Sequence, residues 1–285
     1  LAFLASAFFV PEWVVLARLC QLNDSTGLTA TVAEKGQKCM ENKNNPVHRL
    51  RENLLLLKAG ARNDGQLLQQ WAKVFDCSPG DAIKIFNGIG LMYRLNSEAR
   101  DATQTFSPGS PDFFFKPFAQ IDQLLSVIAL QTQWATVAPL VNEETITALA
   151  FIEHSIDRNY SKSAPGSEEK IPDLLTQIDA LIESCVTANL DVELKKIFVK
   201  QLQALRSALL SFRISGPSGL EDAMAQVTGA LMRNQAVIKD KLDKNDPFSA
   251  KFFDILGKAN DLTAGYQTAV LALAPIGTLL LDVVR

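Results

Sequence analysis

The sequence offers one candidate acid–base group. His154 and Asp157 are three residues apart, which places them on one face of a predicted helix, beside Glu153. Side chains of these types bind metals or transfer protons, but a metal site needs a third ligand and supporting hydrogen bonds around it. The sequence shows neither, and we expect His154 to be a surface or interhelical histidine.

Other patterns of the common enzyme classes are missing from the sequence. We find no Gly-rich phosphate loop, no nucleophile elbow and no dinucleotide fingerprint. The four cysteines, at positions 20, 39, 77 and 185, form no Cys-x-x-Cys pair, and only two histidines could join them around a metal. We predict reduced thiols, no metal, no cofactor and no enzymatic activity, with an unrecognised enzyme as the remaining alternative.

The elements that must position any site are helices. The composition, 47% hydrophobic and 21% charged, is that of a globular protein, and no alternating run of strand type occurs. Apolar residues recur at steps of three and four from Ile171 to Asn234, with breaks near Asn189 and at 215–219, which predicts three helices. We predict an all-α fold, a multi-helix bundle of about nine or ten helices, because such amphipathic helices must bury their stripes together.

Helix-breaking residues divide the chain into three predicted parts. Residues 1–105 form an N-terminal helical subdomain, with a helix-turn-helix-like hairpin at 64–94. Residues 106–117 form a junction rich in Pro and Phe. Residues 118–285 form a C-terminal antiparallel bundle, which is built on 171–285, begins with one helix over 118–138 and ends in an uncharged apolar helix. The predicted N-caps are Asn45, Ser78, Asn142 and Asp191.

The hairpin carries a pattern that is known from DNA-binding proteins. Its residues are Ala72 in the first helix, Cys77 in the turn, Ser78 and Pro79 at the start of the second helix, and then Lys84, Ile85, Asn87 and Gly88. Residues 66–88 resemble the helix-turn-helix of the repressor family, and this resemblance implies a second helix that enters the major groove. Asp76 stands where the family has Gly, and Ala82 where it has a larger aliphatic residue. The groove would meet Gly80, Asp81 and Ile83, which hydrogen-bond poorly to bases.

Charge is unevenly distributed along the chain. The net charge is −3, yet residues 43–100 hold nine Lys and Arg against five Asp and Glu, whereas residues 101–285 hold sixteen against twenty-two. A phosphate backbone would be attracted only to the first of these regions. The candidate phosphate contacts are Arg49, Arg51, Arg62, Lys73 and Lys84.

Both ends of the chain are apolar. Glu12 and Arg18 interrupt the first run, residues 1–22, and we predict a buried or partner-docking helix there. The second run, residues 262–281, has no charge and is long enough to cross a bilayer, although Pro275 favours instead a kinked helix inside a bundle. The candidate membrane or partner contacts are Leu262, Tyr266, Val270, Leu273, Ile276 and Leu280.

Together these features favour a non-enzymatic interaction or scaffold protein of the cytoplasm. It would bind a protein partner, or form a homo-oligomer, through apolar helix faces. The first alternative is a membrane-associated protein that uses its C-terminal segment. The second alternative is a DNA-binding regulator that uses the helix-turn-helix at 66–88.

Overall fold

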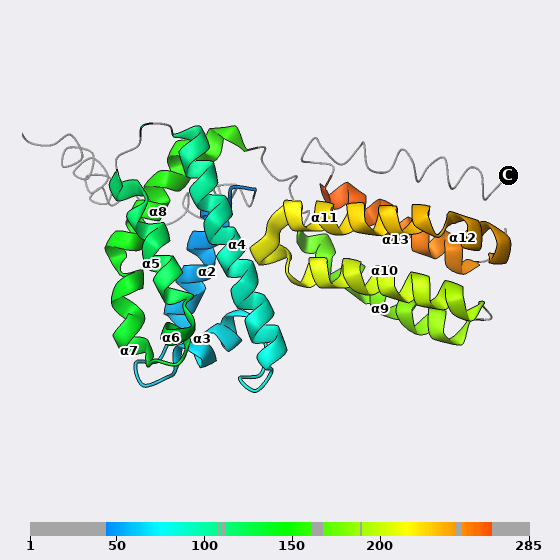
Figure 1. Cartoon of the computed structure of the whole chain (residues 1–285), viewed down its shortest axis with the longest axis horizontal. Helices are drawn as coiled ribbons and strands as arrows, with labels where there is room; N and C mark the ends of the chain where they lie inside the picture. Colours follow the sequence, from blue (N-terminus) through cyan, green and yellow to red (C-terminus); the bar gives the residue numbers. More distant parts are fainter. Residues whose placement is uncertain are drawn as a thin grey trace, which may run out of the picture. The chain divides into compact units, whose positions relative to one another are not determined.

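The computed structural model describes residues 44–107, 109, 112–160, 168–188, 190–242 and 247–263. Over these residues the fold is all-α, as predicted: the only β pairing within them is an isolated antiparallel bridge between Gln66 and Gln133 (Figure 1). The α-helices are α2 (Pro46–Gly60), α3 (Leu67–Val74), α4 (Ala82–Phe106), α5 (Lys116–Leu124), α6 (Val127–Leu130), α7 (Trp134–Val137), α8 (Glu143–Ile156), α9 (Ile171–Thr187), α10 (Val192–Leu210), α11 (Phe212–Arg233), α12 (Gln235–Lys241) and α13 (Pro247–Thr263). Short 3-10 helices are η2 (Asp112–Phe114), η3 (Ala138–Val141), η4 (Asp157–Asn159) and η5 (Glu168–Lys170).

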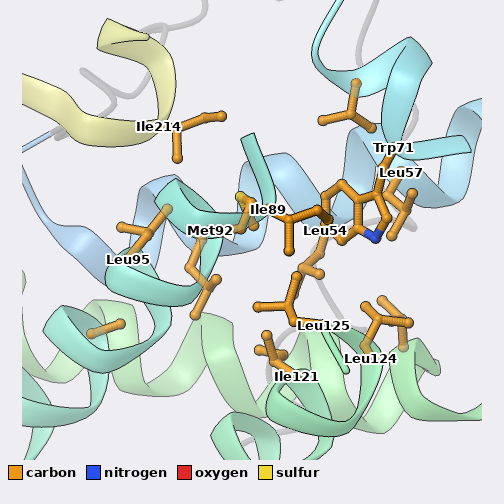
Figure 2. Packing of buried hydrophobic residues seen from close by; sticks show 14 of the residues in the cluster. Leu54, Leu57, Trp71, Ile89, Met92, Leu95, Ile121, Leu124, Leu125 and Ile214 are labelled. Atoms are coloured by element: carbon orange, nitrogen blue, oxygen red, sulfur yellow. The ribbon is translucent and has the colours of Figure 1, made fainter. Parts of the chain in front are cut away.

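The first hydrophobic core lies among helices α2 to α8. Trp71 of α3 and Phe118 of α5 are its largest fully buried side chains, and Leu50, Leu54 and Leu57 of α2 belong to the same core. One member comes from far along the chain: Ile214 of α11 packs on the side of Met92 and Leu95 of α4 (Figure 2). The first core therefore includes one residue of α11, a helix that also contributes Phe212, Leu220 and Met224 to a second core.

The second hydrophobic core lies among helices α9 to α13. Phe198 of α10 is at its centre, with ring centroids 5.1 Å from Phe248 and 4.8 Å from Phe252, both in α13. Helix α13 packs against α9 and α11, and α10 packs against the same two helices. The periodic stripes that predicted helices from Ile171 onward are the residues buried here.

The two cores divide the chain at a different place from the predicted junction. Residues 118–156 share the first core with residues 47–102, although the junction was predicted at 106–117. Phe114 and Phe115 from that stretch pack against the first core. Burial of their aromatic rings is more favourable than exposure of the rings to water. The Pro-rich stretch is thus a connection inside one bundle.

Local capping signals were predicted correctly at three of four helix starts. Asn45, Asn142 and Asp191 are N-caps, and each accepts a hydrogen bond from a backbone N–H of its own first turn. The prediction for Ser78 was wrong: the cap of α4 is Asp81, whose carboxylate accepts from the Lys84 N–H at 3.1 Å. Ser78 instead accepts from the Gly80 N–H, which folds the preceding turn.

Two predicted helix boundaries were also wrong. Residues 118–138 form three short helices rather than one, because the chain turns at Ser126 and again at 131–133, where the bridge holds it against Gln66. Helix α10 ends at Leu210 rather than at 215–219. The break at 215–219 lies inside α11 instead, where Gly216 has a φ of 63°.

Candidate functional site

The predicted helix-turn-helix has a left-handed residue in its turn, but its second helix is also part of the first core. Asp76, at the family's Gly position, has a φ of 50°, a left-handed conformation that Asp tolerates better than most residues. The Cys77 N–H then donates to the Ala72 carbonyl at 2.9 Å, which closes the end of α3. However, the second helix starts at Ala82 and continues for 25 residues through the middle of the first core. It is a core helix as well as the second helix of the hairpin.

The five candidate phosphate contacts do not share one environment. Arg49 is 3% exposed, and its guanidinium donates to Glu98 and to the Ile214 carbonyl, both at 2.9 Å. Arg51 donates to Glu153 at 2.6 Å. The others are exposed, and each has a partner nearby: Arg62 with Asp64 at 3.4 Å, Lys73 with the Gly60 carbonyl at 3.0 Å and Lys84 with Asp81 at 3.3 Å. Arg49 and Arg51 form ion pairs that join helices of the first bundle.

The outer surface of α4 carries an exposed apolar stripe, which we name the α4 face. It consists of Ile83, Phe86, Gly90 and Tyr93, whose spacing of three, four and three residues places them along one side of the helix. The side chains of Ile83, Phe86 and Tyr93 are 76%, 55% and 56% exposed. A row of three large apolar side chains exposed along one side of a helix is typical of an interaction surface.

The sequence pattern did not reveal this surface, because Phe86 and Tyr93 stand three and four residues from Ile89, a spacing that also fits a single buried stripe. Ile85 and Ile89 are buried, whereas both aromatic side chains are exposed. The available signal was Ile83, which continues the exposed stripe toward the N-terminus at the helical period, whereas Ile85, Ile89 and Met92 make a second stripe that already fills the inner face. Two apolar stripes on one helix indicate two contact surfaces.

The buried polar groups of the first bundle join its helices. The Glu153 carboxylate of α8 lies 2.8 Å from His48 Nδ1 and accepts from Arg51 Nε, both in α2. Burial raises the pKa of Glu153, but the hydrogen bonds from His48 and Arg51 outweigh it and hold that pKa below its usual value. His48 is 3% exposed and Glu153 is 20% exposed, and their contact joins α8 to α2.

A second cluster of polar side chains surrounds Glu98 in the middle of α4. Burial raises the pKa of Glu98 although the neighbouring Arg49 guanidinium lowers it, and the charge of Asp222 adds to the effect of burial. Burial, followed by the Glu98 charge, also raises the pKa of Tyr160 to about 12. A cleft of 280 Å³ opens beside Glu98 between α4 and α11, lined by Arg94, Asp222 and three serines among others. Its charges of both signs, spread over two helices, form no recognisable catalytic arrangement.

No group of three metal-ligating side chains occurs among the residues that the structure describes. His154 is exposed at the end of α8, and Asp157 lies 3.5 Å from the Asn45 side chain, so the two predicted acid–base residues have separate surroundings. Cys77 is a half-buried free thiol, and Cys185 is buried in the second core. Burial raises the pKa of Cys77, and the charge of Asp81 adds to this, so its thiolate is disfavoured.

The predicted C-terminal contacts fall mostly outside the described residues. Leu262 is buried in the second core at the end of α13. Tyr266, Val270, Leu273, Ile276 and Leu280 lie outside the described ranges, as does the apolar run 1–22. Among the helices that are described, none is long and apolar enough to span a bilayer.

The chain was compared with protein-family models, curated proteins and solved structures, and none of them matches it.

Proposed function

We propose that this protein is a non-enzymatic helical interaction protein that binds protein partners through the α4 face. The observation that supports this proposal is the exposure of Ile83, Phe86 and Tyr93 along one side of a single helix, within ten residues of each other. Burying each such side chain against a partner contributes about 1.5–3 kcal/mol. A helix anchored in a packed core loses little conformational entropy on binding, which favours it as a docking element.

The chemistry of the face supports protein binding rather than DNA binding. The exposed residues at the start of α4 are Ala82, Ile83, Lys84, Phe86 and Asn87. Base readout depends on hydrogen-bonding side chains, mainly Arg, Lys, Asn and Gln, at these positions. Here apolar side chains predominate, and Lys84 is already paired with Asp81. Protein interfaces, in contrast, are enriched in aromatic residues.

The test compares two matched substitutions, Ile83→Asp in α4 and Val192→Asp in α10. Both residues are exposed, at 76% and 67%, and both stand in the first turn of a helix, where an Asp is compatible with the helix dipole. Each variant is checked for folding by circular dichroism and then used in quantitative affinity purification and in sedimentation velocity. We expect Ile83→Asp, and not Val192→Asp, to lose associated protein. Equal association by both variants and the wild type would remove the α4 face from consideration.

A further inference from the structure

Four exposed residues of α4 occupy symmetric positions about Gly90. Phe86 and Arg94 lie four residues to either side of it, and Asn87 and Tyr93 lie three residues to either side. All five are exposed. A Cβ placed on Gly90 would meet no other atom within 4 Å, so open space lies above the helix backbone at the centre of this arrangement.

We propose that the partner of the α4 face is a second copy of this chain, with the two α4 helices antiparallel across a two-fold axis at Gly90. This inference rests on the proposed function and specifies its partner. An interface with two-fold symmetry uses the same patch on both copies, so the patch must be complementary to itself. Antiparallel pairing about Gly90 places Phe86 opposite Arg94 of the second copy, and Asn87 opposite Tyr93 of the second copy.

The pairs that this symmetry creates are electrostatically complementary. A guanidinium over an aromatic ring is attracted by the negative face of that ring. Arg94 is exposed and makes none of the ion pairs found among the described residues, so its charge is available. The two Arg94 residues would be separated by about 12 Å along the helices, from eight residues at 1.5 Å each. That distance exceeds the Debye length at physiological salt, so their repulsion is weak.

Gly90 at the axis allows the two helix backbones to approach closely, as small residues do at helix crossings. The contact is small. Three apolar side chains bury at most about 150–250 Å² each, which is less than the 800 Å² or so that a standard interface buries on each side. The dimer is therefore expected to associate weakly, with a dissociation constant in the micromolar range.

The first test is a charge exchange followed by sedimentation velocity over a wide concentration series of the full chain. Phe86→Arg places a cation opposite Arg94 of the second copy, and we expect it to weaken dimerisation by about tenfold or more, which is 1.4 kcal/mol. Adding Arg94→Glu to Phe86→Arg restores an attractive pair across the axis and should recover the dimer. Within one chain these positions are two turns apart, so recovery would report the contact between copies.

The second test uses disulfide formation, which requires Cα atoms about 4.4–6.8 Å apart. We expect Gly90→Cys to form a covalent dimer under mild oxidation. Ser97→Cys, exposed on the same helix, serves as the matched control because its two copies would lie about 21 Å apart along the axis. The wild type measures the background from the native thiols.

Three results would overturn the inference. These are a wild-type chain that remains monomeric at every concentration, a double variant that fails to recover association, and equal cross-linking at positions 90 and 97. If the chain is monomeric while Ile83→Asp still loses a different associated protein, the second copy is the wrong partner and the proposed function stands. If Ile83→Asp and Val192→Asp behave alike as well, both proposals fail.

Discussion

Arg49 and Ile214 are 165 residues apart in the sequence and are joined by a hydrogen bond from the Arg49 guanidinium to the Ile214 backbone carbonyl, with Nη1 and O 2.9 Å apart. The other terminal nitrogen of Arg49 donates to Glu98. The side chain of Ile214 is buried in the first core beside α4. Arg49 therefore joins α2, α4 and the start of α11. A second contact starts from α11, where the Arg213 guanidinium donates to the Val74 carbonyl of α3.

The contact between Arg49 and the start of α11 depends on the glycine at position 216. Its φ of 63° and ψ of −161° belong to a region that is essentially restricted to glycine. A Cβ at this position would also lie 2.2 Å from Arg49 Nη1. The backbone conformation and the approach of the guanidinium both require a residue without a side chain.

Gly216→Ala is expected to lower the free energy of unfolding by about 3 kcal/mol. The strained backbone alone costs about 1–3 kcal/mol, and displacement of Arg49 adds to this. Gly257→Ala is the matched control, because a Cβ there meets nothing within 4 Å and the residue lies inside α13. Urea denaturation of both variants measures the difference. An unchanged midpoint for Gly216→Ala would show that the kink at 216 is not maintained in solution.

Arg49→Met should destabilise the protein by about 2–3 kcal/mol, since it leaves the half-buried Glu98 carboxylate and the Ile214 carbonyl without this donor. Arg213→Met provides the comparison: its side chain is exposed, and we expect a loss below about 1 kcal/mol. Guanidinium denaturation followed by far-UV circular dichroism gives both values. Equal losses at the two positions would contradict the central role of Arg49.

Glu153 should make the protein lose stability in acid. Its pKa lies below the usual 4.5, because the hydrogen bonds from His48 and Arg51 outweigh the opposing effect of burial. The folded state thus binds fewer protons than the unfolded state, so the stabilisation is complete above pH 4.5 and is lost as the pH falls through the folded pKa.

Glu153→Gln is expected to cost about 2 kcal/mol near pH 7, where both charge-assisted bonds are lost. The gap between variant and wild type should narrow as the pH falls below 4.5. Denaturation midpoints across a pH series measure this convergence. A gap that stays constant with pH would mean that the ionised carboxylate contributes nothing specific.

Gly90→Ala and Gly88→Ala should have opposite effects although they are two residues apart. An exposed glycine inside a helix is less stable than alanine by about 1 kcal/mol, so at concentrations where the chain is monomeric Gly90→Ala should raise the melting temperature by about 2–4 °C. At Gly88 the new Cβ would lie 2.5 Å from the Phe75 ring, and the melting temperature should fall. Thermal melts of both variants are sufficient. Two shifts of the same sign would contradict the placement of Gly88 on the buried side of α4 and of Gly90 on its exposed side.

The interaction surface was predictable only in part. The sequence indicated that residues of α4 form the second helix of a hairpin, because the helical period depends on neighbouring residues alone. It could not indicate that Phe86 and Tyr93 stay in water. That depends on which side of α4 receives α2, α5 and α8, and those helices come from other parts of the chain.

The sequence by itself determined the helical class, the stripes of α9 to α11 and the caps at Asn45, Asn142 and Asp191. These features depend on hydrogen bonds and side-chain spacing within one or two turns. Only the tertiary structure decided that residues 118–156 join the first core, that Arg49 is a buried link to α11, and that Gly216 must be glycine. The physical reason is that each of these depends on a contact between residues far apart in the sequence, which no local pattern encodes.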